Sequence, residues 1–315
     1  MLAVRKYGCA SRRNLRLLAT ESTRSNQPSR LTMDVDTDEL DQPQRWYGTN
    51  LVGVPSLLLG SAAFNSNPVP LAIAGTRETH TGLFALLERS QDLSEAQDMF
   101  THYMAIAFGL RKPDADELRN MGASEQRRWH SSWRKLLQGW GMDANGVAGA
   151  VLKGWVESRF GLVPSFHKAP LVRFPSPAWV TYLQEKTASR HNNNNIHQQL
   201  DLLYEFCQWA LRRSLLAGIT PANKHLLLWR GSNRCEEQVI AGRLQNRRCT
   251  VRLNNLVSFS QCAQDASVFG DWVFEVQVPV CKVLVCPGLL PGQVLQGEQE
   301  VLALGGNFEV TARYA

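Results

Sequence analysis

Three segments between Leu226 and Gly306 determine the architecture of this chain: Leu226-Leu227-Leu228-Trp229-Arg230-Gly231, Ser258-Phe259-Ser260 and Gly297-Glu298-Gln299-Glu300-Val301-Leu302-Ala303-Leu304-Gly305-Gly306. Each segment combines apolar residues typical of a β-strand with one to three polar side chains. The polar groups therefore come in the order arginine, paired serines and paired glutamates on successive predicted strands.

The paired glutamates have the clearest chemical implication. Side chains alternate between the two faces of a strand, so Glu298 and Glu300 point to the same side. Two carboxylates on one face repel each other unless a cation lies between them. The pair is therefore suited to a cationic substrate group, or to a transition state that carries positive charge.

Arg230, Ser258 and Ser260 supply the complementary groups. An arginine can donate two parallel hydrogen bonds to a phosphate or carboxylate, and the two serine hydroxyls share one strand face. Each segment alone has an ordinary explanation: a solvated acidic face, a surface cation in a salt bridge, or serines that fill a turn or strand. The ordered combination is much less expected by chance than any single segment.

The whole chain predicts an α+β fold, with a helical part over residues 46–220 and a β-rich part over residues 221–315. Ser94 and Gln97 have the spacing of a capping box, which predicts a helix that ends near Gly109. Helical periodicity predicts further helices over residues 125–140, 148–159 and 196–217, the last with one buried stripe. Predicted strands cover residues 71–74, 225–230, 251–260, 271–278 and 281–285, a segment that contains Glu298, and residues 307–313.

Two local patterns carry further expectations. The nearly continuous apolar run over residues 225–230 predicts a strand buried on both faces. Residues 161–178 contain four prolines and predict a surface loop, in which His167 and Lys168 are candidates for contact with a partner but are better explained as solvated.

The net charge of +6 is concentrated at the amino terminus. Residues 1–32 contain seven basic residues and one acidic residue, whereas the rest of the chain has 27 of each. Residues 1–45 are expected to be a disordered basic and acidic tail, and Met33 is an alternative initiator. A neutral globular part argues against a nucleic-acid-binding protein.

The sequence also disfavours a membrane-spanning protein, a disulfide-bonded protein and a metal-binding protein. No apolar run approaches the ~20 residues that a membrane-spanning helix needs. The chain has seven cysteines and no Cys-x-x-Cys motif, which favours free buried thiols and a cytoplasmic location. Asp143-Ala144-Asn145-Gly146 is a turn without the additional acids of a calcium loop, so no metal site is predicted.

Longer strings of residues carry a resemblance to a known family. They are Asp143-Ala144-Asn145-Gly146, Val151-Leu152-Lys153-Gly154-Trp155-Val156-Glu157-Ser158-Arg159-Phe160, Leu202-Leu203-Tyr204-Glu205-Phe206-Cys207-Gln208-Trp209, Asn254-Asn255-Leu256-Val257-Ser258-Phe259-Ser260 and Phe269-Gly270-Asp271. With Arg230, Ser258 and Glu300, the chain resembles the Arg-Ser-Glu class of mono-ADP-ribosyltransferases. Over residues 50–310 it is similar to the dinitrogenase-reductase ADP-ribosyltransferases of nitrogen-fixing bacteria.

This resemblance implies NAD as a consumed substrate, held in a cleft between two packed β-sheets. It implies that Glu300 is catalytic and bonds the 2′-hydroxyl of the nicotinamide ribose, that Arg230 holds the pyrophosphate or its ribose, and that Ser258 positions the ribose and supports Glu300. Three further NAD-binding residues are implied: Gly231 through its backbone, Ser260 beside Ser258, and Phe269. Phe269 either stacks near nicotinamide or is simply a core aromatic.

The resemblance also implies the acceptor and the partners. An acid or amide two residues before the catalytic glutamate is a mark of arginine modification in this class, which assigns acceptor recognition to Glu298. The implied protein substrate is dinitrogenase reductase, whose modification would switch off nitrogen fixation, and the implied regulator is a PII signalling protein. Because NAD chemistry does not require the helical part, we expect it to dock the target and the regulator.

Two alternatives remain open from the sequence. One is an arginine-specific ADP-ribosyltransferase with another target, or an NAD glycohydrolase. The other is a binding module that kept the fold and lost the chemistry, which the presence of Arg230, Ser258, Glu298 and Glu300 argues against.

Overall fold

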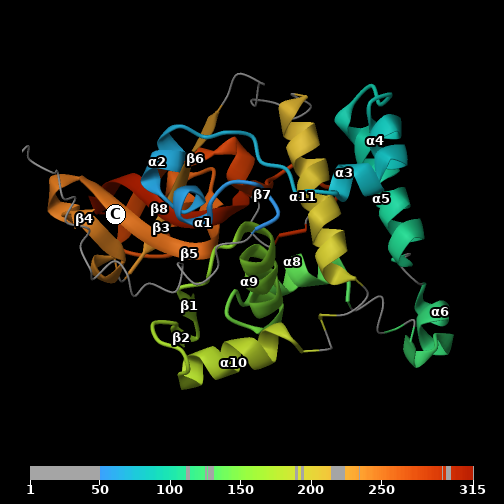
Figure 1. The fold of residues 1–315 in the computed structure, drawn as a ribbon, viewed down its shortest axis with the longest axis horizontal. Helices are drawn as coiled ribbons and strands as arrows, with labels where there is room; N and C mark the ends of the chain where they lie inside the picture. The colour runs from blue at the N-terminus through green and yellow to red at the C-terminus, as the bar shows by residue number, and fades with distance from the viewer. Residues whose placement is uncertain are drawn as a thin grey trace, which may run out of the picture. The chain divides into compact units, whose positions relative to one another are not determined.

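The computed structural model describes residues 50–110, 114–124, 126, 131–188, 191–192, 195–213, 224–233, 235–292, 294–295 and 299–314. The long helices precede the main sheet in the chain, so the predicted α+β class is confirmed (Figure 1). One apolar core includes residues of both parts. The predicted tail and Met33 lie outside the described residues, and the division of function near residue 220 remains a prediction.

The helices are α1 (Ser56–Leu59), α2 (Ala62–Ser66), α3 (Thr76–Thr79), α4 (Thr81–Leu87), α5 (Leu93–Phe108), α6 (Ala115–Asn120), α8 (Trp133–Met142), α9 (Val147–Phe160), α10 (Pro177–Lys186), α11 (Ile196–Arg212) and α12 (Ala263–Ser267). The strands are β1 (Phe166–His167), β2 (Ala169–Pro170), β3 (His225–Ser232), β4 (Val239–Gly242), β5 (Arg248–Ser260), β6 (Trp272–Pro279), β7 (Val283–Val285) and β8 (Glu300–Tyr314).

β5 and β8 are the two longest strands of the main sheet, and they pair antiparallel along most of their length. The six strands have the order β4-β5-β3-β6-β8-β7, and the additional β5–β8 pairing links β5, β3, β6 and β8 into a closed ring. The strands that were expected to form two packed sheets are therefore connected in one hydrogen-bonded network. β1 and β2 form a separate small hairpin.

A bulge sets the register of β5 against β8. The pairing shifts between Leu253 and Leu256, opposite the glycine pair in β8. A Cβ on Gly305 would lie 1.5 Å from the backbone oxygen of Asn254, so only glycine permits this approach. The prediction of two separate strands, one containing Glu298 and one over residues 307–313, was wrong, because β8 runs without a break through the glycine pair and the extra residue of the bulge lies in β5.

α11 lies against the short strand β7 and the 3-10 turn that precedes it. Tyr204 Oη donates a hydrogen bond to the carbonyl of Cys281 at 2.7 Å, and Gln208 Nε2 donates to the carbonyl of Val283 at 2.8 Å. Nearly every residue of α11 is buried. The predicted single buried stripe was therefore too narrow, because this helix packs inside the molecule rather than on its surface.

Polar side chains connect the helices that surround α11. Glu205 accepts a hydrogen bond from the backbone N–H of Ile73 at 2.7 Å and pairs with Arg77 at 2.6 Å. Asp201 accepts from Trp155 Nε1 at 2.7 Å and pairs with Arg159 at 2.8 Å. Residues 71–74 are consequently not a strand, since part of their backbone bonds to a helix side chain.

Two other local predictions were wrong for identifiable reasons. α5 is capped by Asp92, whose carboxylate accepts from the Glu95 N–H at 2.8 Å, so Ser94 lies inside the first turn and caps nothing. Leu227 in β3 has 43% of its surface exposed, so this strand is buried on one face only.

The cysteines behave as the sequence predicts within the described part of the chain. Cys207, Cys235, Cys249, Cys281 and Cys286 are buried free thiols, and Cys262 is partly buried and free. Burial raises the pKa of Cys281 to about 11 and that of Cys286 to about 12, which makes these thiols poor nucleophiles.

Lys282 should make stability depend on pH. It is fully buried, its Nζ donates to the carbonyl of Gly305 at 3.1 Å, and the rings of Phe64 and Phe308 lie 5.4 and 5.1 Å away. Burial lowers its pKa from 10.5 to about 7. Between these two values the unfolded chain binds more protons than the folded protein, so stability rises with pH. Relative to Lys282→Met, we expect the unfolding free energy to gain up to ~1.4 kcal/mol per pH unit in this window.

Urea unfolding of both proteins from pH 7.5 to 9.5 measures this gain. Lys224→Met, which changes an exposed lysine just before β3, is the matched control and should follow the parent curve. Parallel curves for Lys282→Met and the parent protein would contradict the assignment.

Candidate active site

The three polar segments of the sequence meet where β3, β5 and β8 adjoin. Trp229 is paired with Ser260, and Ser260 is paired with Glu300. This register brings Arg230 and Ser258 close to the first residue of β8. The predicted convergence of an arginine, a serine pair and a glutamate is therefore present in the structure.

Ser258 is the central residue of a hydrogen-bond chain. Its hydroxyl donates to Glu300 Oε1 at 2.6 Å and accepts from the indole Nε1 of Trp140 at 2.9 Å. Trp140 is 5% exposed and belongs to α8, which is in the helical part. Sequence reasoning missed this residue, although the spacing of Trp133 and Trp140 places both on one helix face.

Arg230 contacts the backbone of Ser258. Its Nη1 donates to the backbone carbonyl of Ser258 at 2.7 Å. Its Nε is buried and has no hydrogen-bond partner among the residues that the structure describes. Burial lowers the pKa of Arg230, and the nearby Glu300 carboxylate partly offsets this. An unpaired buried guanidinium N–H can bind an anionic or carbonyl oxygen of a ligand.

Gly231 has a packing reason to be glycine. A Cβ at this position would lie 2.0 Å from the backbone oxygen of Ala266, the fourth residue of α12. Its predicted contact with nicotinamide remains a prediction. The hydroxyl of Ser260 accepts from the Cys262 N–H at 3.0 Å and so helps to shape the loop before α12.

Phe269 follows α12 and is 72% exposed. This exposure contradicts the alternative of a core aromatic, and it leaves the ring free to stack on a ligand. Glu298, the predicted acceptor-recognition residue, lies outside the described residues. Its position relative to Glu300 therefore stays a prediction.

A buried polar cluster around Lys153 lies close to the ring of Trp140. The Nζ of Lys153 donates to Asn145 Oδ1 at 3.0 Å and to the carbonyl of Phe166 at 3.1 Å, and it lies 6.0 Å from the Trp140 ring. His167 is fully buried and lies 2.7 Å from a carboxylate oxygen of Glu185, so its predicted solvated position was wrong. Burial lowers the pKa of Lys153 to about 8 and also lowers that of His167.

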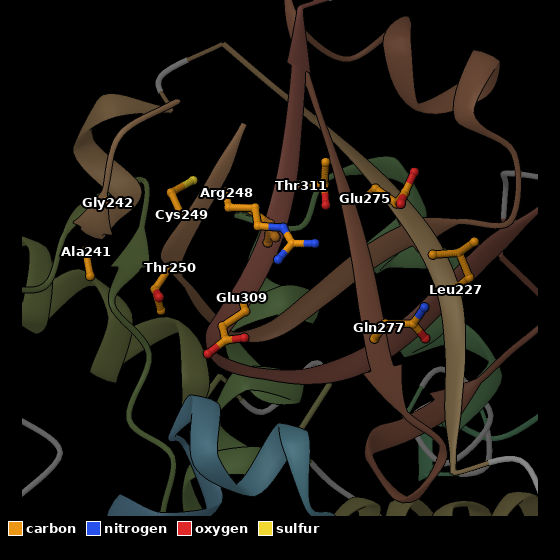
Figure 2. A pocket seen from close by; sticks show the side chains of 11 residues that line it. Leu227, Ala241, Gly242, Arg248, Cys249, Thr250, Glu275, Gln277, Glu309 and Thr311 are labelled. Carbon is orange, nitrogen blue, oxygen red and sulfur yellow. The ribbon is translucent and has the colours of Figure 1, made fainter. Parts of the chain in front are cut away.

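An open pocket lies elsewhere on the sheet. The pocket has a volume of about 540 Å³ and is lined by side chains that include Leu227, Arg248, Glu275 and Glu309 (Figure 2). These residues belong to the far half of β8 and its neighbours rather than to the end that begins at Glu300. The pocket is therefore distinct from the Ser258–Glu300 site.

Metal-binding clusters and membrane-spanning helices are both absent from the described part of the chain. Among the residues with defined positions, no group of three or more His, Cys, Asp or Glu side chains has the geometry to hold a metal ion. Within the same part of the chain, no helix has both the length and the apolar character to cross a bilayer.

The fold and the site define the class of protein. A β-core that brings an arginine, a Ser-x-Ser segment and a glutamate together is the arrangement of the Arg-Ser-Glu ADP-ribosyltransferases. The chain belongs to the dinitrogenase reductase ADP-ribosyltransferase family, whose model matches residues 49–312.

One curated relative is similar over nearly its whole length. The NAD(+)–dinitrogen-reductase ADP-D-ribosyltransferase of Rhodospirillum rubrum is 47% identical over 274 residues, which cover 87% of this chain and 98% of the relative. No solved structure matches the chain.

The geometry of Arg230 predicts the effect of a conservative substitution. A lysine keeps the charge, but its N–H donors all lie on one nitrogen, so Arg230→Lys cannot reproduce the geometry in which Nη1 bonds the Ser258 carbonyl while the separate Nε remains available to a ligand. We expect kcat/KM for NAD to fall about tenfold or more, with most of the effect in KM.

Steady-state kinetics across NAD concentrations tests this expectation. Arg248→Lys, which alters an exposed arginine in β5 beside the distant pocket, is the matched control. Equal kinetics of the two variants would argue against a ligand-binding role for Arg230.

Proposed function

We propose that this protein transfers ADP-ribose from NAD to an arginine side chain of dinitrogenase reductase, releases nicotinamide and thereby switches nitrogen fixation off. The single observation that carries the site assignment is the hydrogen bond of 2.6 Å between Ser258 Oγ and Glu300 Oε1, beside a buried arginine N–H that lacks a partner among the described residues. Family membership and the printed name of the curated relative support the reaction and the target.

The reaction breaks the bond between the ribose anomeric carbon and the nicotinamide nitrogen. Nicotinamide leaves as a neutral molecule with the bonding electron pair, and the ribose becomes oxocarbenium-like and positively charged. A guanidinium nitrogen of the acceptor then bonds to the anomeric carbon and loses one proton. Glu300 stabilises the positive charge of the ribose, because a fixed carboxylate interacts more strongly with the transition state than with neutral NAD-ribose.

The residues around Glu300 fit the remaining parts of NAD. Arg230 offers its unpaired Nε to the pyrophosphate or its ribose. Ser258 orients Glu300 and the nicotinamide ribose, Gly231 presents backbone groups to the nicotinamide amide, and Phe269 stacks near its ring. Ser260 supports the loop before α12 from the neighbouring position.

Arginine specificity rests on Glu298. Its carboxylate pairs with the incoming guanidinium and accepts the proton that the attacking nitrogen loses. The reaction takes place in the cytoplasm, where the target is made, and a PII signalling protein regulates it. Arginine specificity, the cytoplasmic location and regulation by PII go beyond family membership. They rest on the resemblance and on the chemistry of the side chains.

Glu300→Gln tests the core of the proposal. The amide keeps the shape of the side chain and removes its charge, so we expect ADP-ribose transfer to fall by about 10²–10³-fold while NAD binding is largely retained. Intact-mass spectrometry of dinitrogenase reductase after incubation with NAD measures transfer, and calorimetry measures NAD binding. Glu309→Gln, at an exposed position of the same strand, is the control and should remain active. Undiminished transfer by Glu300→Gln would refute the assignment.

Glu298→Ala tests the acceptor assignment separately. Without this carboxylate, we expect arginine modification to fall about 100-fold, while slow release of nicotinamide from NAD by water continues. Gln299→Ala, which alters the exposed neighbour of Glu298, is the control. Equal losses of both reactions would assign Glu298 to NAD chemistry instead. A parent protein that releases nicotinamide but never modifies dinitrogenase reductase would favour the glycohydrolase or another target.

A further inference from the structure

We propose that Trp140 is a positioning residue for ADP-ribose transfer: its indole N–H holds the hydroxyl of Ser258 in the orientation that donates to Glu300. This inference rests on the proposed function of Glu300 and Ser258. It adds a residue from the helical part of the chain to a site that is otherwise built on strands.

The chemistry of the three groups fixes the direction of the hydrogen bonds. An indole Nε1–H is only a donor, so Ser258 Oγ must accept from Trp140 at 2.9 Å. The single hydroxyl proton of Ser258 is then free to point at Glu300 Oε1, 2.6 Å away. Linked hydrogen bonds polarise one another, so donation by Trp140 strengthens donation by Ser258.

Trp140 is itself held in place by its surroundings. It is the last inward residue of α8, after Trp133, Leu136 and Leu137, and only 5% of its surface is exposed. The ammonium group of Lys153 in α9 lies 6.0 Å from its ring. A tryptophan packed in this way has little rotameric freedom, so its N–H is a fixed donor.

Helix α9 and the segment that follows it restrain β5 at a second point. Asn255 Nδ2 donates to the carbonyl of Lys153 at 2.9 Å and to the carbonyl of Leu162 at 2.8 Å. Three residues later, Ser258 receives the indole bond from α8 and, at its carbonyl, the bond of 2.7 Å from Arg230. Both the backbone and the side chain of Ser258 are therefore restrained before NAD binds.

This restraint matters because Glu300 has two oxygens and two tasks. Oε1 accepts from Ser258, which leaves Oε2 to accept from the ribose hydroxyl and to face the developing positive charge. If the Ser258 hydroxyl rotated away, the carboxylate could turn and lose this alignment. The effect should appear in kcat, since the alignment matters most in the transition state.

Trp140→Phe removes the N–H and keeps an aromatic ring. We expect kcat for transfer to dinitrogenase reductase to fall about tenfold and KM for NAD to change less than about twofold. Trp179→Phe is the matched control: Trp179 is also 5% exposed, and its Nε1 has no hydrogen-bond partner among the described residues. Its kcat should equal that of the parent protein.

A double-mutant cycle separates positioning from packing. If Trp140 acts through the Ser258 hydroxyl, Trp140→Phe has no further effect on kcat in a Ser258→Ala background. If it only fills space, the two losses multiply and the inference is overturned. A second variant with benzothienylalanine at position 140 retains the two-ring shape without the N–H. It must show the same loss of kcat even if Trp140→Phe lowers the thermal midpoint.

Glu300→Gln, measured in the same assay, distinguishes a failure of the proposed active site from a failure of the Trp140 role alone. An active Glu300→Gln protein would refute the proposed active site as a whole. If the Glu300→Gln protein is inactive but the benzothienylalanine variant is fully active, only the role of Trp140 is refuted.

Discussion

The antiparallel pairing of β5 with β8 is the constraint on which the site depends. It places Ser260 opposite Glu300 and Ser258 opposite Leu302, which lets a serine hydroxyl reach a carboxylate on the adjacent strand. A slip of one residue would turn every side chain of a strand to the other face. The bulge at Asn254 and Asn255, opposite Gly305, prevents such a slip because the close approach of the backbones fits only one register.

The bulge also connects the sheet to the helices. Asn254 Nδ2 donates to the carbonyl of Phe166 at 2.8 Å, and its Oδ1 accepts from the Ser165 N–H at 3.0 Å. Asn255 bonds the carbonyls of Lys153 and Leu162. Two adjacent asparagines thus fix the strand register and the position of α9 at once. A bulge exposes backbone that the sheet does not pair, and here it lets side chains bind distant segments.

The parts of the structure that follow from local pattern were predictable from the sequence. Strand patterns located β3, β5, β6 and β7 and placed Ser258 and Ser260 on one face, and the ordered polar groups indicated that Arg230, Ser258 and Glu300 meet. Residues whose role depends on contacts between distant elements were not predictable in this way. The partner of the Trp140 N–H depends on where α8 lies against β5, and His167 is buried because Lys153 and Glu185 enclose it.

The contacts of α8 and α9 bear on how a docking role for the helical part can be examined. These helices supply the indole that bonds Ser258 and the Lys153 carbonyl that bonds Asn255, and α11 is buried in the same core. Deletion of residues 46–220 would expose the core and free Ser258, so loss of NAD chemistry would follow whether or not these helices dock a protein. Docking therefore has to be sought in exposed side chains, such as Ile106 at 79% and Met142 at 76% exposure, whose substitution leaves the core intact.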